Sequence, residues 1–347
     1  MALSERRIAR REFLKQGARG SGLLALSAVV AAGSARSARA ADGAKASNPF
    51  AYDVSEWDRT DPALIQYQEV NRFNIANPEP RRIAVGPGDR LYVATKRGVS
   101  VFLKEGAVLS EISLSSPARC VAVAADGTVY AGVRDHLEVY DPKGQRIAIW
   151  DSPSRRTWLT GLALGENDLF AADSANRCVL RYDRNGTLIG RIGEKNKDRN
   201  IPGLIVPSPY LDVEIGRDGL LRINNPGRHS VELYTSSGDL EASWGKPSVA
   251  IEGFCGCCNP VALALLPNGR CVTCEKGLPR VKVYSSEGIF DCVVAGPESF
   301  SENGKAGSVH DLSDGTMGGL DAAVDSQGRI YILDFVSRGV RVMQKKV

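Results

Sequence analysis

One short motif recurs along the chain: an apolar strand, a tight turn containing glycine, and a second strand. The clearest copies of the turn and the second strand are Asp126–Tyr130, Asp218–Arg222, Asn268–Val272 and Gln327–Tyr331. Asp-Gly and Asn-Gly pairs accept the positive φ angles of two-residue hairpins, so they separate consecutive antiparallel strands. The motif returns at intervals of about 40–50 residues, which is the period of a four-stranded propeller blade.

Six copies of the motif can be counted, and their first strands would lie innermost in a ring. These strands begin near Arg82, Cys120, Leu159, Leu211, Val261 and Leu320. The sixth copy supplies only three strands before the chain ends at Val347, whereas Ile65–Phe73 forms an unassigned strand near the other end. Pairing Ile65–Phe73 with the three strands of the sixth copy would close the ring and remove a free sheet edge. We therefore predict an all-β, six-bladed β-propeller of four-stranded antiparallel blades over residues 64–347.

Two segments, Phe170–Arg177 and Tyr331–Arg338, resemble the repeat of NHL propellers, and Val272–Glu275 is a weaker copy. The resemblance extends over residues 64–347 and implies a six-bladed propeller. NHL-like propellers include ligand-binding scaffolds, protein-interaction domains, lyases and lactonases, so the resemblance leaves the function open. Gluconolactonase-like relatives hold a divalent metal with Glu, Asn and Asp, and no complete set of these residues can be matched here.

The first residues resemble an export signal of the twin-arginine type. Arg10 and Arg11 lie in the segment Ala9–Lys15, an apolar stretch follows over Ser21–Gly33, and Ala38–Ala40 has the small-x-small pattern of a cleavage site. We predict a signal peptide over residues 1–40, a lead-in segment over 41–63 and the propeller over 64–347. The expected location is the periplasm, reached by the twin-arginine pathway, which exports folded proteins.

The charge of the chain depends on that signal. Residues 1–40 carry eight basic and two acidic side chains, so cleavage would change the formal net charge from +4 to −2. A slightly acidic mature chain lacks the basic surface that nucleic-acid binding needs. The apolar stretch of the signal is shorter than the roughly 20 residues of a spanning helix. We expect a monomer that binds no nucleic acid and has no stable membrane span after cleavage.

The ends of the six second strands should lie at one level of the ring. The equivalent positions are Thr95, Val133, Asp173, Asn225, Glu275 and Asp334. Four of them, Asp173, Asn225, Glu275 and Asp334, offer oxygen ligands for a channel cation such as calcium. Basic residues follow three of the carboxylates, at Arg177, Arg280 and Arg338. We therefore favour an arginine–carboxylate brace at these three turns, which leaves Asn225 less explained.

Cysteines form the other candidate site. Cys255, Cys257 and Cys258 end one of three long inter-blade segments (Glu194–Pro209, Lys246–Pro260 and Pro297–Gly319), and Cys271 and Cys274 lie on the next second strand. Residues three apart on a strand point to opposite faces, so Cys271 and Cys274 should not share an ion. We expect Cys255, Cys257, Cys258 and Cys274 to bind an iron–sulfur cluster or a thiophilic metal ion, with Cys271 in reserve.

Disulfides are the alternative for the same cysteines. The chain has eight cysteines, the predicted compartment is oxidising, and Cys255–Cys274 or Cys257–Cys271 bridges would anchor the loop. The remaining three are Cys120 and Cys178, expected as small buried hydrophobes, and Cys292, expected on the outer strand of its blade. Histidines are few, at His136, His229 and His310, which argues against a histidine-based hydrolase site.

Three functional hypotheses follow. The first is a cysteine-rich metal or iron–sulfur protein in electron transfer or cofactor maturation, with a periplasmic or membrane redox protein as partner. The second is a cofactor-free, disulfide-stapled scaffold that binds a protein or glycan. The third is a gluconolactonase-like, metal-dependent hydrolase. The sequence shows no nucleophile next to a base, so it leaves open whether the protein is an enzyme.

Overall fold

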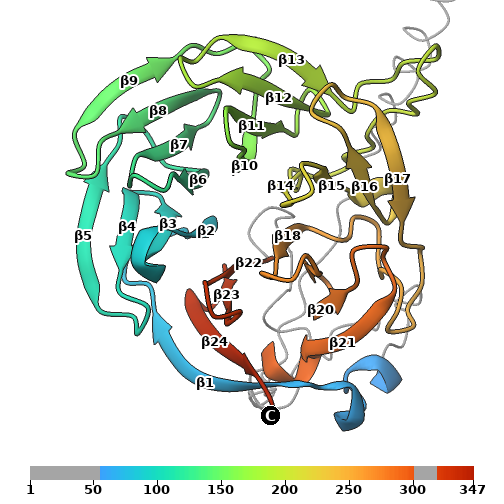
Figure 1. The fold of residues 1–347 in the computed structure, drawn as a ribbon. Helices are drawn as coiled ribbons and strands as arrows, with labels where there is room; N and C mark the ends of the chain where they lie inside the picture. The colour runs from blue at the N-terminus through green and yellow to red at the C-terminus, as the bar shows by residue number, and fades with distance from the viewer. Residues whose placement is uncertain (1–54, 301–318) are drawn as a thin grey trace, which may run out of the picture. The chain divides into compact units, whose positions relative to one another are not determined.

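The computed structural model describes residues 55–300 and 319–347, which form six four-stranded antiparallel sheets arranged in a ring (Figure 1). The all-β propeller prediction is confirmed. The predicted signal, residues 1–40, and most of the lead-in lie outside the described residues, as does His310.

Five blades run outward from the channel in chain order, and the sixth takes its outermost strand from β1. The innermost strands are β2 (Arg82–Val85), β6 (Cys120–Val123), β10 (Leu159–Leu164), β14 (Val213–Ile215), β18 (Ala262–Leu265) and β22 (Leu320–Val324). The second strands are β3 (Leu91–Thr95), β7 (Val129–Val133), β11 (Asp168–Asp173), β15 (Leu221–Asn225), β19 (Cys271–Cys274) and β23 (Ile330–Asp334). Four of the six predicted first-strand starts match, and the other two lie within two residues.

The outer half of each blade has the same order. The third strands are β4 (Gly98–Phe102), β8 (His136–Tyr140), β12 (Cys178–Asp183), β16 (Ser230–Tyr234), β20 (Val281–Tyr284) and β24 (Gly339–Lys345). The outermost strands are β5 (Val108–Ser113), β9 (Arg146–Trp150), β13 (Leu188–Ile192), β17 (Leu240–Trp244), β21 (Phe290–Ala295) and β1 (Tyr67–Asn74). The short 3-10 helices are η2 (Ser55–Trp57), η3 (Pro62–Leu64), η4 (Pro87–Asp89), η5 (Pro226–Arg228) and η6 (Pro297–Phe300).

The ring closes as the sequence predicts. Strand β1 pairs antiparallel with β24, from Tyr67 opposite Lys345 to Asn74 opposite Gly339, and Figure 1 shows it completing the sixth blade beside the C-terminus. This pairing gives the three-stranded C-terminal blade its fourth strand. It also ties together the two ends of the described chain, because main-chain hydrogen bonds join them.

The glycine turns define the strand boundaries inside the blades. In the second blade Gly127 has a φ of 90°, and the Asp126 carboxylate accepts a hydrogen bond of 2.9 Å from the amide of Thr128. A left-handed φ costs glycine little, and the aspartate satisfies an amide that the turn leaves free. These local contacts explain why the sequence repeat and the strand repeat coincide.

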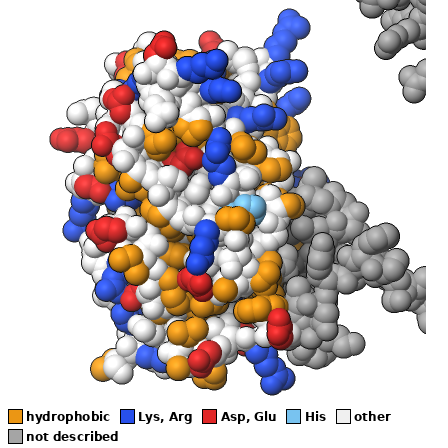
Figure 2. Space-filling view, turned by 90° about the vertical axis from the view of Figure 1, so that its right-hand side faces the viewer, with side chains coloured by type: hydrophobic (Ala, Val, Ile, Leu, Met, Phe, Trp, Pro, Cys, Tyr) orange, Lys and Arg blue, Asp and Glu red, His pale blue; other side chains and the backbone are white. Residues whose placement is uncertain are grey.

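The core lies between adjacent blades. Cys120 and Leu137 of the second blade pack against Leu159 and Leu169 of the third, and equivalent apolar clusters join the other blades. Along residues 55–300 and 319–347, no helix has the length and apolar character that a membrane crossing requires. Figure 2 shows acidic, basic and apolar side chains interspersed over one side of the ring.

Candidate functional site

The second-strand ends considered as a channel ring lie inside the blades. Thr95, Val133, Asp173, Asn225 and Glu275 are fully buried, and Asp334 is nearly so. They lie one strand away from the channel, because β2 and its equivalents line it instead. Within the described part of the chain, no three His, Cys, Asp or Glu side chains are arranged to hold a metal ion.

Two of the three predicted arginine braces are wrong. Asp173 accepts hydrogen bonds from the amides of Trp158 and Asn176, both at 3.1 Å, and Asp334 accepts one of 2.9 Å from the amide of Val336. No ion pair to Arg177 or Arg338 is found among the described residues. In both blades the carboxylate instead caps the backbone between the second and third strands, where turn amides have no other partner.

Asn225 connects a long loop to its blade. Its side-chain oxygen accepts a hydrogen bond of 2.9 Å from the amide of Ile205, and its side-chain nitrogen donates one of 2.7 Å to Glu232. Both functional groups of the amide are therefore used. Asn225 therefore holds the segment 194–209 in place. This role explains Asn225, which the arginine–carboxylate brace did not.

The third brace is confirmed and extends further than predicted. Glu275 is fully buried and pairs with Arg280 at 2.8 Å and with Lys282 at 2.8 Å. We call Glu275, Arg280 and Lys282 the loop clamp, because they also bind the segment 246–260, here the cysteine loop. Burial lowers the pKa of Lys282 to about 8, although the charge of Glu275 opposes this.

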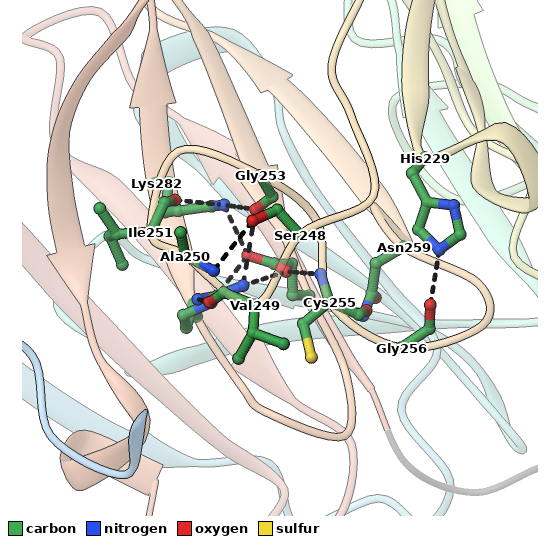
Figure 3. Close-up of polar contacts among 12 residues, drawn as sticks. His229, Ser248, Val249, Ala250, Ile251, Gly253, Cys255, Gly256, Asn259 and Lys282 are labelled. Carbon is green, nitrogen blue, oxygen red and sulfur yellow. Dashed lines mark hydrogen bonds and ion pairs between the residues drawn. The ribbon is translucent and has the colours of Figure 1, made fainter. Parts of the chain in front are cut away.

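Figure 3 shows hydrogen bonds between the loop clamp and the backbone of the cysteine loop. Lys282 donates to the carbonyls of Ile251 and Gly253 at 2.9 and 2.6 Å, and Glu275 accepts from the amide of Cys255 at 3.0 Å. Arg280 adds a bond of 2.9 Å to the carbonyl of Val249. The buried charges thus satisfy loop groups that would otherwise be unpaired away from water.

The tip of the cysteine loop is held by two further side chains. Asn259 donates to the carbonyls of Cys255 and Lys276 at 2.6 and 2.9 Å and accepts from the amide of Lys276 at 2.9 Å. His229 lies 2.5 Å from the carbonyl of Gly256 through Nε2 (Figure 3). Residues 255–259 are therefore anchored on both sides.

Only two of the four predicted metal-ligating cysteines have their sulfurs in contact. The Sγ atoms of Cys257 and Cys258 are 3.3 Å apart, with Cys257 exposed and Cys258 only 3% exposed. Burial raises the pKa of the Cys258 thiol, but hydrogen bonds from Ser208 and Cys257 and the charge of Lys276 outweigh it and lower the pKa overall. The Cys255 sulfur points away from the clamp in Figure 3.

Cys274 and Cys271 lie on opposite faces of β19, as predicted from their spacing. Cys274 packs among apolar residues toward the sixth blade, whereas Cys271 packs with Val231 and Leu233 of the fourth. Cys258 belongs to neither cluster. Cys274 therefore packs in a hydrophobic interior where the loop enters the blade, since its carbonyl accepts a hydrogen bond of 2.8 Å from the amide of Val261, and all eight cysteines, each of them described, are free thiols.

The three remaining cysteines are buried, and for Cys120 and Cys178 this confirms the prediction of small interior hydrophobes. Cys120, Cys178 and Cys292 are at most 1% exposed. Burial raises the pKa values of the Cys120 and Cys178 thiols to about 12. Cys292 lies on the outermost strand β21, as expected.

The channel contains a cavity of about 760 Å³ that the sequence reasoning missed. All six innermost strands line it, and so do the turns after β14, β18 and β22, such as Gly216–Asp218 and Pro267–Gly269. The cavity therefore occupies the channel from the first residues of the inner strands to the face that carries the turns between first and second strands. The cysteine loop enters β18 from the opposite face.

One buried arginine and two aspartates close the inner end of this channel cavity. Arg82 Nη1 lies 2.8 Å from Asp321 and 3.1 Å from Asp212, and Arg82 Nε donates to the carbonyl of Thr160 at 2.6 Å. The aspartates also accept from the amides of Ile83 and Leu263. We call Arg82, Asp212 and Asp321 the channel floor.

The floor carries a surplus of negative charge, because one guanidinium faces two carboxyl groups. Burial raises the pKa of Asp212 to about 7, against the attraction of Arg82 and with the support of Asp321. Burial likewise raises the pKa of Asp321, against Arg82. The two carboxyl groups therefore share a site in which ionising both is costly.

Glu214 stands alone above this floor. It lies on β14 and lines the cavity, and its carboxyl group makes no hydrogen bond or ion pair among the described residues. Its side chain is only partly exposed, and the surface it retains opens into the cavity. Burial raises its pKa well above the usual value, and the charges of Asp212 and Asp321 add to the effect.

Comparison with known proteins supports the fold and goes no further. No family model matches the chain, and no curated protein matches it. Among solved structures, a streptogramin B lyase aligns with a TM-score of 0.56 and 14% identity over 82% of this chain and all of that one. Selenomethionine-substituted virginiamycin B lyase from Staphylococcus aureus aligns with a TM-score of 0.55 and 12% identity, over 81% of this chain and 100% of that one.

A catalytically inactive virginiamycin B lyase from the same organism, crystallised with quinupristin, gives a TM-score of 0.54 and 14% identity over 81% of this chain and 100% of that one. Identities this low show a shared propeller architecture and leave chemistry open. The resemblance to NHL repeats is likewise supported only as a six-bladed propeller.

Proposed function

We propose that the channel cavity binds a small polar molecule and that Glu214, in its protonated form, acts as a general acid in cleaving a bond of that molecule. The observation that carries this proposal is the unpaired carboxyl group of Glu214. The carboxyl group of Glu214 faces the cavity and has no protein partner among the described residues, so it is available to a ligand there.

The setting of Glu214 suits proton donation. Burial and the charges of Asp212 and Asp321 raise its pKa well above the usual value, which favours the protonated form, and a protonated carboxyl group can give a proton to a leaving oxygen or nitrogen. The Asp212–Arg82–Asp321 floor holds its charges in fixed hydrogen bonds, so ionisation of Glu214 is disfavoured until a proton acceptor arrives. A cavity of about 760 Å³ has the size of small-molecule sites.

The proposal can be tested with a panel of lactones, esters and streptogramin B compounds, including quinupristin. The last group is chosen because the similar structures are named as lyases of that class. We expect one class to be cleaved, and the Glu214→Gln variant to lose roughly 100-fold or more in rate, as expected when a general acid is removed.

A matched control is Glu241→Gln, since Glu241 is an exposed glutamate on the outer strand β17. This variant should keep the wild-type rate. Full activity of Glu214→Gln toward the cleaved compound would refute the role of Glu214. A cavity-blocking variant such as Ala264→Phe that leaves turnover unchanged would refute the channel as the site.

The cysteine-rich metal site and twin-arginine export stay predictions. Four cysteines do not converge in the described residues, so the arrangement does not fit a four-thiolate centre, and no step is assigned to a cluster or metal. Iron and acid-labile sulfide analysis of protein purified anaerobically from an export-competent host tests the cluster. N-terminal sequencing of the exported form tests cleavage before Ala41.

A further inference from the structure

Cys257 and Cys258 form a pair of thiols that the channel proposal does not use. Their Sγ atoms are 3.3 Å apart, one thiol is exposed, and the other lies directly beneath it at 3% exposure. A thiol at the surface can meet another molecule, whereas one at 3% exposure is reached mainly by its neighbour. The pair therefore combines an accessible sulfur with a second sulfur in contact with it.

The contact between the two thiols is a property of a firmly held loop. The loop clamp binds three carbonyls and one amide upstream of Cys257, and Asn259 makes three hydrogen bonds immediately downstream of Cys258. The loop backbone around the pair is thus fixed from the blade beneath it. A rigid backbone keeps Cys258 next to any mixed disulfide formed on Cys257, although a bridge between adjacent residues is strained, because their Cα atoms are about 3.8 Å apart, closer than in most disulfides.

The other cysteines of this blade are poorly placed to react with the Cys257–Cys258 pair. Cys271 and Cys274 are buried in separate apolar clusters, and Cys255 directs its sulfur away from the clamp (Figure 3). Lys276 and Ser208 lie beside Cys258, with Lys276 Nζ 3.4 Å from Ser208 Oγ.

We propose that Cys257 and Cys258 are a two-electron thiol–disulfide couple that exchanges with an accessible disulfide bond of another molecule. In the first step the sulfur of Cys257 attacks one sulfur of that disulfide, its proton passes to the departing thiolate, and a mixed disulfide forms. In the second step Cys258 attacks the Cys257 sulfur and releases the other thiol. The protein loses two electrons and two protons, and the foreign disulfide is reduced to two thiols.

The test uses the full-length chain, reduced and then exposed to oxidised glutathione, followed by alkylation and peptide mass spectrometry. We expect Cys257 and Cys258 to become protected together as an internal bridge. In Cys258→Ser the reaction should stop at a glutathione adduct on Cys257, and in Cys257→Ser protection of position 258 should be lost. The control variant Cys292→Ser changes a buried thiol on β21 and should behave as wild type.

A second arm replaces glutathione with insulin as a protein disulfide, with dithiothreitol as the terminal reductant. Reduction of both probes indicates an unselective couple, and reduction of one identifies the class of substrate. A stable adduct on Cys257 beside a free Cys258 in wild type overturns the proposal. A bridge to Cys255, or no reaction with either probe, overturns it too.

Discussion

The channel floor and the cysteine loop both lie where inner strands begin, and they are built in contrasting ways. The channel floor brings together Arg82, Asp212 and Asp321, from three different blades. The cysteine loop is one continuous segment held by Glu275, Arg280 and Lys282 of the blade that it enters. One site therefore depends on closure of the whole ring, and the other on a single blade.

The two regions also differ in whether their buried charges are paired. In the loop clamp Glu275 has both a guanidinium and an ammonium partner, so its charge stabilises the structure. In the channel Glu214 has no partner among the described residues. The comparison teaches that a carboxyl group with charged partners serves the structure here, whereas one that faces a cavity without a protein partner is a candidate for chemistry.

The largest loss of stability is expected from Arg82→Met, which removes the cation of the channel floor. The substitution leaves two buried carboxyl groups facing each other without a cation, and removal of one member of a buried ion pair costs about 3–5 kcal/mol. Urea unfolding should show this loss in the free energy of unfolding. Arg90→Met changes an exposed arginine and should stay within about 0.5 kcal/mol of wild type.

A smaller loss of stability should follow Glu275→Gln, which removes the anion of the loop clamp. The amide keeps hydrogen-bonding atoms but leaves Arg280 and Lys282 buried without their anion, at a cost of roughly 2–3 kcal/mol. The loop should loosen as well, so alkylation of Cys255 should accelerate relative to Cys257. Unchanged alkylation rates would show that the clamp does not hold the loop.

The Glu214→Gln variant should be more stable than wild type at pH 8 and equal to it near pH 4. Because the pKa of Glu214 is raised in the folded state, the unfolded chain releases this proton first, and stability falls as pH rises from the unfolded pKa toward the folded one. The gain should grow as the pH rises across this range. Thermal unfolding across this pH range measures it, and a pH-independent difference would contradict the account.

The smallest effect is expected for Cys274→Val. The thiol lies in an apolar cluster, and a swap between side chains of similar size in such a place costs less than about 1.5 kcal/mol. Both unfolding and the metal content of purified protein should match wild type. Loss of bound metal in this variant alone would restore Cys274 as a ligand.

The sequence predicts the fold well because its signals are local. Turns such as Asp126-Gly127 mark each hairpin, and the three-stranded last copy requires the strand that becomes β1. Spacing along β19 likewise separates Cys271 from Cys274 correctly. The turns and the β19 spacing depend on residues close together in the chain, and the β1 pairing follows from the count of repeats.

The channel site could not be found in the same way. Arg82, Asp212 and Asp321 meet only when six blades close, and no local pattern sets their distances. A usable signal was present, since each is a charged residue at the start of an otherwise apolar inner strand. Comparison of the second strands instead drew attention to Asp173 and Asp334, whose carboxylates cap turns.

The most direct test of the central claim is the protonation state of Glu214. Infrared difference spectra between wild type and Glu214→Gln, recorded across a pH series, isolate the absorption of this carboxyl group. The account predicts a protonated carboxyl band in wild type at pH 7 that gives way to a carboxylate band only at higher pH. A carboxylate band at pH 7 would contradict it, because Glu214 would then have no proton to donate.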